Sequence, residues 1–302
     1  MTPRQVIGVI PGTAPQLLMF GRLLADAAQA LPALAPLPVG DGIAVVLAES
    51  GLSPLAAVGA GPVATAGGDR AGQATADGKV MARGEAGAGR LADPAELGLA
   101  WVPARAALPT LTLADQHAAL RAVAVANWRQ RSRFCPACGS PVEPNHRSEG
   151  YHCVREERAI FPRTDPCVIT AILDQDERLL LCHAANHPTR LYTLVAGFVE
   201  AGEALETAVR REALEEVGVE LSELRFIRSQ PWPFPGSLMA SFSALAKSTA
   251  IRVDGAEITD ATWFTRPALA RALDAGQVTL PMDYSVARQT IESWRAGALP
   301  AR

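Results

Sequence analysis

The stretch GFVEAGEALETAVRREALEEVGV, residues 197–219, contains the most strongly patterned helix in the sequence. Its apolar residues recur at helical spacing, and Gly218 predicts where the helix ends. Glu212, Glu215 and Glu216 stand at positions i, i+3 and i+4, so they share one arc of that helix. Carboxylates this close raise one another's pKa and destabilise the fold unless a cation lies among them. Clustered hard oxygen ligands suit Mg²⁺ or Mn²⁺.

The helix alone leaves two interpretations open. It could be an exposed helix on which glutamates pair with Arg210 and Arg211. Alternatively, the carboxylates lie at the edge of a buried site, because Leu205, Ala208 and Val209 fall on or beside the same arc. A solvated acidic face would not be interrupted by leucine and valine, which favours the second interpretation.

The residues that flank the helix complete a longer pattern, made of Gly197, Glu203, Arg211, Glu212, Glu215, Glu216, Gly218 and Val219. This pattern resembles the Nudix box, the loop–helix–loop signature of Nudix hydrolases. The resemblance implies hydrolysis of a diphosphate that is linked to another moiety, typically a nucleoside. Such chemistry depends largely on positioning and on neutralising charge, which divalent ions between the carboxylates and the diphosphate would supply.

The resemblance also implies roles for single residues of the box. Arg211 would orient the catalytic glutamates, and Glu212 and Glu216 are the first candidates for metal ligands. Glu215 would be a ligand or a base. The backbone carbonyl of Ala196 would complete a coordination sphere.

The string SQPWPFPGS, residues 229–237, is a second distinctive motif in a chain with only 5% aromatic residues. Its three prolines exclude a helix interior or a central strand and predict a stiff, extended segment. A Nudix box followed by this string resembles the NADH pyrophosphatase subgroup. The resemblance implies cleavage of NADH or NAD⁺ into nicotinamide mononucleotide and AMP, and some members also remove NAD caps from RNA 5′ ends. The substrate site would be lined by Gln230, Pro231, Trp232, Pro233, Phe234, Pro235, Gly236 and Ser237. Alternatively, Trp232 and Phe234 simply fill the core beside a turn.

Further positions match the same subgroup. Glu257 would complete the metal site from outside the box. Phe161 matches an aromatic residue that stacks on the nicotinamide ring, and Phe198 could also stack. Ala287 matches a residue whose backbone meets the substrate, and Arg105 is a weaker match to a substrate-binding arginine.

A cysteine-bearing segment precedes these motifs. The subgroup carries a zinc ribbon with four cysteines, of which Cys135, Cys138 and Cys153 are present here, whereas Glu156 replaces the fourth. Carboxylates can bind Zn²⁺, although they are rarer in structural sites. His146 and His152 are other candidates for the fourth ligand, and a ribbon held by packing without metal is the alternative.

The fold predicted from these motifs is α+β. We expect an N-terminal α+β domain over residues 1–125, a zinc ribbon over residues 131–160, and a Nudix α/β/α sandwich with a mixed sheet over residues 161–302. The resemblance further implies a homodimer.

The composition of the chain argues against several kinds of partner and location. The 302 residues include 28 Lys and Arg against 31 Asp and Glu, a near balance that argues against duplex DNA as the main partner. No apolar run reaches the roughly 18 residues that span a bilayer, and five irregularly spaced cysteines do not form a disulfide framework. We therefore expect a cytoplasmic protein that binds no membrane.

The rival functions are a Nudix hydrolase of another nucleotide, such as ADP-ribose, and a non-catalytic nucleotide sensor. The sensor is disfavoured because all the glutamates of the box are present.

Overall fold

The computed structural model describes residues 99–299 except 112 and 146–149, and before residue 99 it describes the backbone of six short strands. The predicted domain over residues 1–125 therefore lies largely outside the described residues, as does His146 entirely. The chain divides into two compact units. The first comprises Met1–Arg163 and Trp232–Gly236, and the second comprises Thr164–Pro231 and Ser237–Arg302.

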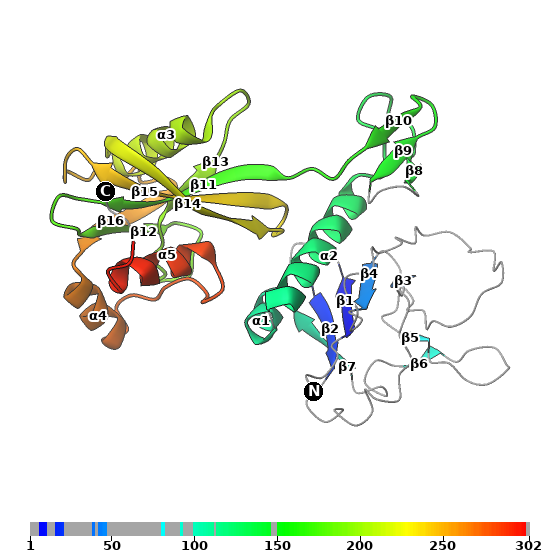
Figure 1. Ribbon diagram of the computed structural model, residues 1–302, viewed down its shortest axis with the longest axis horizontal. Helices are drawn as coiled ribbons and strands as arrows, with labels where there is room; N and C mark the ends of the chain where they lie inside the picture. The colour runs from blue at the N-terminus through cyan, green and yellow to red at the C-terminus, as the bar shows by residue number, and fades with distance from the viewer. Residues whose placement is uncertain are drawn as a thin grey trace. The chain divides into compact units, whose positions relative to one another are not determined.

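The first unit combines small antiparallel sheets with one long helix (Figure 1). The strands of its five-stranded sheet follow the order β3-β4-β1-β2-β7, and a three-stranded sheet has the order β10-β9-β8. The elements are β1 (Val6–Ile10), β2 (Gln16–Phe20), β3 (Pro38–Val39), β4 (Gly42–Val46), β5 (Val80–Met81), β6 (Leu91–Ala92), β7 (Leu99–Pro103), α1 (Ala104–Ala107), the 3₁₀ helix η3 (Leu108–Thr110), α2 (Leu113–Arg131), β8 (Glu143–Pro144), β9 (Tyr151–Cys153) and β10 (Arg158–Ile160).

The second unit is built on a six-stranded mixed sheet. The strand order is β14-β15-β11-β12-β16, and β13 pairs with β11; β11 runs parallel to β15 and antiparallel to β13. The elements are β11 (Asp165–Leu173), β12 (Leu179–Ala184), β13 (Val195–Phe198), α3 (Leu205–Val217), β14 (Leu221–Trp232), β15 (Ser237–Ala246), β16 (Ile258–Phe264), α4 (Arg266–Asp274) and α5 (Val286–Arg295).

Strand β11 explains why this unit has helices on both faces of its sheet. Its residues Cys167–Leu173 are all buried, so successive side chains enter two different cores. Val168 and Ile172 pack in the core that α3 covers, whereas Ile169 and Leu173 pack in the core that α4 and α5 cover. Figure 1 shows α3 on one side of the sheet and α4 and α5 on the other. The predicted α/β/α sandwich with a mixed sheet is confirmed for this unit.

The predicted end of the acidic helix is confirmed. Gly218 has a φ of 68° and is the C-cap of α3. Its N–H donates to the Leu214 carbonyl at 3.1 Å, and the Val219 N–H donates to the Ala213 carbonyl at 3.0 Å, so the last carbonyls of the helix are satisfied. A Cβ at this position would lie 3.0 Å from Cβ of Arg252, so glycine meets both a conformational and a steric need.

A polar turn at residues 174–177 connects β11 to β12. Buried Asp174 accepts the N–H groups of Asp176 and Arg178 at 3.0 and 2.8 Å, and its carboxylate pairs with Nε of Arg178 at 2.6 Å. A side chain that supplies the acceptors of its own turn holds the two strands in one register.

Strand β14 lies at the edge of the sheet. It can therefore contain Pro231, which has no N–H to donate to a neighbouring strand.

Within the described part of the chain, no helix combines the length and the apolar character needed to cross a bilayer.

Candidate active site

The acidic arc of α3 divides into buried and exposed carboxylates. Glu212 and Glu216 are only 9% and 7% exposed, whereas the side chain of Glu215 is 60% exposed. The helix therefore turns two carboxylates inward while its third remains at the surface. Of the two interpretations that the sequence left open, this arrangement supports the buried site for Glu212 and Glu216.

Arg211 connects the acidic residues through five hydrogen bonds. Its guanidinium binds both oxygens of Glu203, at 2.9 and 2.8 Å, in the forked geometry that suits arginine and a carboxylate. It also donates to Glu212 at 2.8 Å, to Glu215 at 3.0 Å, and to the Phe198 carbonyl at 2.9 Å. These bonds keep the pKa of Arg211 above its usual value and that of Glu203 below it. The same contacts tie α3 to the end of β13.

Glycine at position 197 allows the carboxylate of Glu212 to approach β13. A Cβ built on Gly197 would lie 1.9 Å from Cδ of Glu212, closer than any real contact. The first glycine of the box is therefore needed for close approach, and any larger residue would displace Glu212.

Glu216 has an oxygen without a partner. Burial is the largest cause that raises its pKa, to about 8, and the charges of Glu212 and Glu257 raise it further. The N–H of Ala196 donates to this carboxylate, which offsets part of the shift. Its Oε2 is buried with no hydrogen-bond partner among the described residues. A buried carboxylate oxygen with no donor fits a cation as its missing partner, so Glu216 suits the role of a ligand to a divalent metal.

Glu257 joins this site from the loop that precedes β16. Asp254 holds the loop, since its carboxylate accepts the N–H groups of Glu257 and Ile258 at 2.9 and 2.8 Å. Glu257 itself is exposed, and its charge contributes to the raised pKa of both Glu212 and Glu216. The acidic residues predicted from inside and outside the box therefore lie close enough for their charges to interact.

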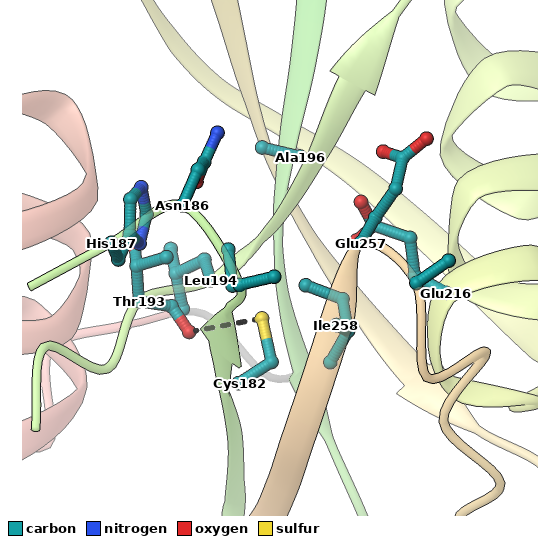
Figure 2. Close-up of a pocket in the computed structure, with 12 residues that line it drawn as sticks. Cys182, Asn186, His187, Thr193, Leu194, Ala196, Glu216, Glu257 and Ile258 are labelled. Carbon is teal, nitrogen blue, oxygen red and sulfur yellow. Dashed lines mark hydrogen bonds between the residues drawn. The ribbon is translucent and has the colours of Figure 1, made fainter. Parts of the chain in front are cut away.

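A cavity of about 370 Å³ opens beside these carboxylates. Figure 2 shows Glu216 and Glu257 on one side of it, and Asn186 and His187 on the opposite side. Ala196 also lines the cavity. A volume of this size can admit part of a nucleotide beside the acidic residues.

The carboxylates beside this cavity are spaced too widely to form a closed set of metal ligands. Within the described residues, the only group of three or more metal-ligating side chains whose donor atoms all lie within 4.8 Å of one another consists of thiols. Glu212, Glu216 and Glu257 do not meet that spacing. Mg²⁺ commonly keeps several waters and binds through one or two carboxylates, so the looser arrangement suits it.

The predicted substrate residues of the second unit differ in their surroundings. Phe198 is 57% exposed and can stack on a ring, whereas Ala287 is buried in the first turn of α5. The amide of Gln230 already bonds the backbone, donating to the Tyr284 carbonyl and accepting from the Val286 N–H, both at 2.7 Å. In this structure Gln230 fixes the segment that leads to Ala287.

The predicted substrate residues of the first unit include two rings of the proline string. Trp232 and Phe234 are both half-buried and meet edge to face, with ring centroids 5.3 Å apart. The guanidinium of Arg105 lies 4.8 Å from the Phe234 centroid and 5.6 Å from that of Trp232. Neither ring is fully enclosed in a core. Phe161 is 66% exposed.

The remaining members of the string are Pro231 and Pro235, which are exposed, Gly236, which is half-buried, and Pro233 and Ser237, which are buried.

Three thiols gather in the first unit. The ligand atoms of Cys135, Cys138 and Cys153 lie within 4.8 Å of one another, and the group includes neither Glu156 nor His152. Such a set of three thiolates fits Zn²⁺, which prefers sulfur and nitrogen ligands.

The two halves of the cysteine segment have the same local geometry. The N–H groups of Cys138 and Ala137 donate to the Cys135 thiol and hold its pKa below the usual value. The N–H groups of Glu156 and Arg155 donate in the same way to Cys153, although burial raises the pKa of that thiol. Each half ends on a residue with positive φ, 70° at Gly139 and 48° at Glu157. Glu156 therefore occupies the position in its half that Cys138 occupies in the other.

Comparison with known proteins identifies the second unit. Residues 163–282 match the family model of the NUDIX domain. This region is a NUDIX domain. The chain is 40% identical over 184 residues to the NAD-capped RNA hydrolase NudC of Mycobacterium bovis. The aligned region covers 58% of this chain and 59% of that protein. It is 36% identical over 204 residues to the human NAD-capped RNA hydrolase NUDT12, and this aligned region covers 64% of this chain and 44% of that protein.

The matched portions thus span about half the length of each relative. A solved structure of a NUDIX hydrolase from Nitrosomonas europaea covers 49% of this chain and 97% of its own, at 22% identity and a TM-score of 0.39. A score of this size supports no statement about function.

Two residues of the NUDIX domain contribute to the site without having been assigned a role from the sequence. Glu203 orients Arg211, and its fixed place in the box is the signal that could have shown this. Asp254 shapes the loop of Glu257, three residues before it, and no sequence pattern marks that contact.

The raised pKa of Glu216 predicts that the NUDIX domain loses stability as the pH rises when divalent metal is absent. The pKa is about 8 in the folded protein against an ordinary 4.5, so the folded state holds this proton more tightly than the unfolded state. The loss of stability caused by ionising Glu216 is absent below the unfolded pKa. It grows as the pH rises from about 5 to 8 and is complete above the folded pKa. Urea unfolding between pH 5 and 8, without magnesium or manganese, measures it.

Glu216→Gln should flatten this slope, while Glu206→Gln, an exposed change on the same helix, should keep it. Adding Mn²⁺ at pH 8 should stabilise the wild type more than Glu216→Gln. An unchanged slope in Glu216→Gln would show that Glu216 is not the group responsible.

Proposed function

We propose that this chain is a divalent-metal-dependent hydrolase that cleaves the diphosphate of NADH and NAD⁺ into nicotinamide mononucleotide and AMP, and that it also removes NAD caps from RNA 5′ ends. The observation that carries the proposal is the pair of buried carboxylates, Glu212 and Glu216, one of which has an oxygen without a partner beside a cavity. The names of the two relatives supply the substrate class.

The acidic residues would hold the metal. Glu212, Glu216 and Glu257 are its carboxylate ligands, with the Ala196 carbonyl as a further donor. Mg²⁺ or Mn²⁺ bound there would neutralise the diphosphate and activate the attacking water. Arg211 fixes the direction of the Glu212 carboxylate and restrains Glu215, which acts as a ligand or as a base.

Aromatic and backbone groups would recognise the rest of the substrate. Phe161 and Phe198 are exposed rings that can stack on a base or on nicotinamide. The string from Gln230 to Ser237 would line the substrate site as a stiff segment that loses little entropy on binding. Ala287 would offer its backbone, which in a homodimer could come from the partner chain. The free thiols support a reducing, cytoplasmic location.

Two alternatives make different predictions. An enzyme specific for ADP-ribose would share the acidic site but would not need to recognise nicotinamide. A non-catalytic sensor would bind nucleotide without turnover. The complete set of box glutamates and the hydrogen bonds that orient them favour an enzyme.

Chromatography of the products of NADH digestion tests the proposal directly. The wild type with Mg²⁺ or Mn²⁺ should produce reduced nicotinamide mononucleotide and AMP in equal amounts. Glu216→Gln should reduce kcat by about a hundredfold or more, because a neutral amide cannot serve as an anionic metal ligand. The exposed change Glu206→Gln should leave kcat unaltered.

Turnover of NADH, NAD⁺, ADP-ribose and an NAD-capped oligonucleotide should be compared with the same preparation. A marked preference for ADP-ribose would replace the proposed substrate, and binding of all four without products would support the sensor.

We further propose that the cysteine segment binds one structural Zn²⁺ through Cys135, Cys138, Cys153 and the carboxylate of Glu156. The support is the clustering of the three thiols and the matched geometry of the two halves. In the first unit, bound zinc would fix the three-stranded sheet next to α2.

Atomic emission should find one zinc per chain in the purified protein. Cys138→Ser should lose most of it, and Glu156→Gln should release zinc to a chelator faster than the wild type, whereas Glu156→Cys should release it more slowly. A wild-type protein without stoichiometric zinc would favour the metal-free ribbon.

A further inference from the structure

The proline string has a shortage of backbone donors. Positions 231, 233 and 235 are prolines, so Trp232 and Phe234 are the sole N–H donors in that stretch. The N–H of Phe234 is already used, since it donates to the Trp232 carbonyl at 2.8 Å. The carbonyls of the prolines therefore have few N–H donors close by and depend largely on donors elsewhere or on water.

Asn127, on helix α2, supplies such donors. Its Nδ2 donates to the Pro233 carbonyl at 2.8 Å and lies 3.4 Å from the Pro235 carbonyl. The residue is only 1% exposed, and Pro233 is buried as well. One amide group thus reaches two carbonyls on either side of Phe234. All of these residues belong to the first unit.

The rings between these carbonyls are held by further contacts. Trp232 and Phe234 meet edge to face, and the guanidinium of Arg105 lies near both ring centroids. Asn127 fixes the backbone of the string, while Arg105 restrains its rings from α1. The direction of the two rings therefore depends on α1 and α2.

Helix α2 is a firm support for Asn127. The next residue, Trp128, packs on Tyr151 with ring centroids 5.1 Å apart, and the guanidinium of Arg129 lies 5.7 Å from the same tyrosine ring. Tyr151 is two residues before Cys153 in strand β9. This end of the helix is thus fastened to the cysteine segment, which limits how far Asn127 can move.

We propose that Asn127 is a positioning residue that sets the affinity for the dinucleotide by holding the Pro233 and Pro235 carbonyls. This inference rests on the proposed function, in which the string lines the substrate site. In this role Asn127 acts on substrate binding and not on the metal, because its Nδ2 donates to the string.

Asn127→Asp tests the proposal with little change in side-chain volume, because an ionised carboxylate, which an alkaline assay buffer favours, cannot donate to the two carbonyls. Asn127→Ser is the second variant, since it retains a small neutral donor. Gln130→Ala is the matched control, an exposed change near the end of the same helix. The readouts are kcat and KM for NADH at saturating Mn²⁺, and the Mn²⁺ concentration at half-maximal rate.

The KM of Asn127→Asp should rise about tenfold, as expected when a contact worth about 1.4 kcal/mol is lost. Its kcat and its Mn²⁺ requirement should stay within about twofold of the wild type, because a positioning role predicts this split between KM and kcat. Asn127→Ser should show a smaller rise in KM, and Gln130→Ala should show none.

Two kinetic results would overturn the proposal: an unchanged KM in folded Asn127→Asp, or a loss of kcat at constant KM. If neither Asn127 variant folds, Asn127 has a structural role alone and the proposal is wrong. A wild type that does not cleave NADH would instead refute the proposed function, which separates the two failures.

Discussion

The five hydrogen bonds of Arg211 are the interaction on which the acidic site depends. They join the loop of Glu203, the end of β13 and the two catalytic candidates Glu212 and Glu215. A single guanidinium can do this because its planar donors face several acceptors at once. Replacing it with lysine would keep the charge but not the geometry. The charge of Arg211 also favours ionised Glu212, against the burial that raises its pKa.

Among the described residues, Arg211 makes no hydrogen bond to Glu216, so the two buried carboxylates differ in their surroundings. Glu216 has its N–H donor at Ala196, but its second oxygen is buried without a partner. Burial and two neighbouring carboxylates make its charge unfavourable in the folded protein without metal. A divalent cation bound beside Glu216 would offset both of these unfavourable contributions. The helix is therefore arranged so that its least stable charge faces the cavity where a diphosphate would bind.

Much of this site could be predicted from the sequence because its determinants are local. The spacing of Glu212 and Glu216 and the end of the helix at Gly218 both depend on contacts between residues close in the chain. The exposure of Glu215 depends instead on how the helix lies against β11 and β13, which helical periodicity does not fix.

Contacts over long separations could not be predicted. The amide of Gln230 bonds the backbone 54 and 56 residues further along the chain, and Asn127 reaches a carbonyl 106 residues away. No spacing rule links such residues, although the run of prolines did indicate a rigid segment. The proposed hydrolase activity requires that Glu212 and Glu216 bind a cation. Calorimetric titration of the wild type with Mn²⁺ is the most direct measurement. Binding that weakens at least tenfold in Glu216→Gln is the predicted result, and no uptake by the wild type at millimolar Mn²⁺ would contradict it.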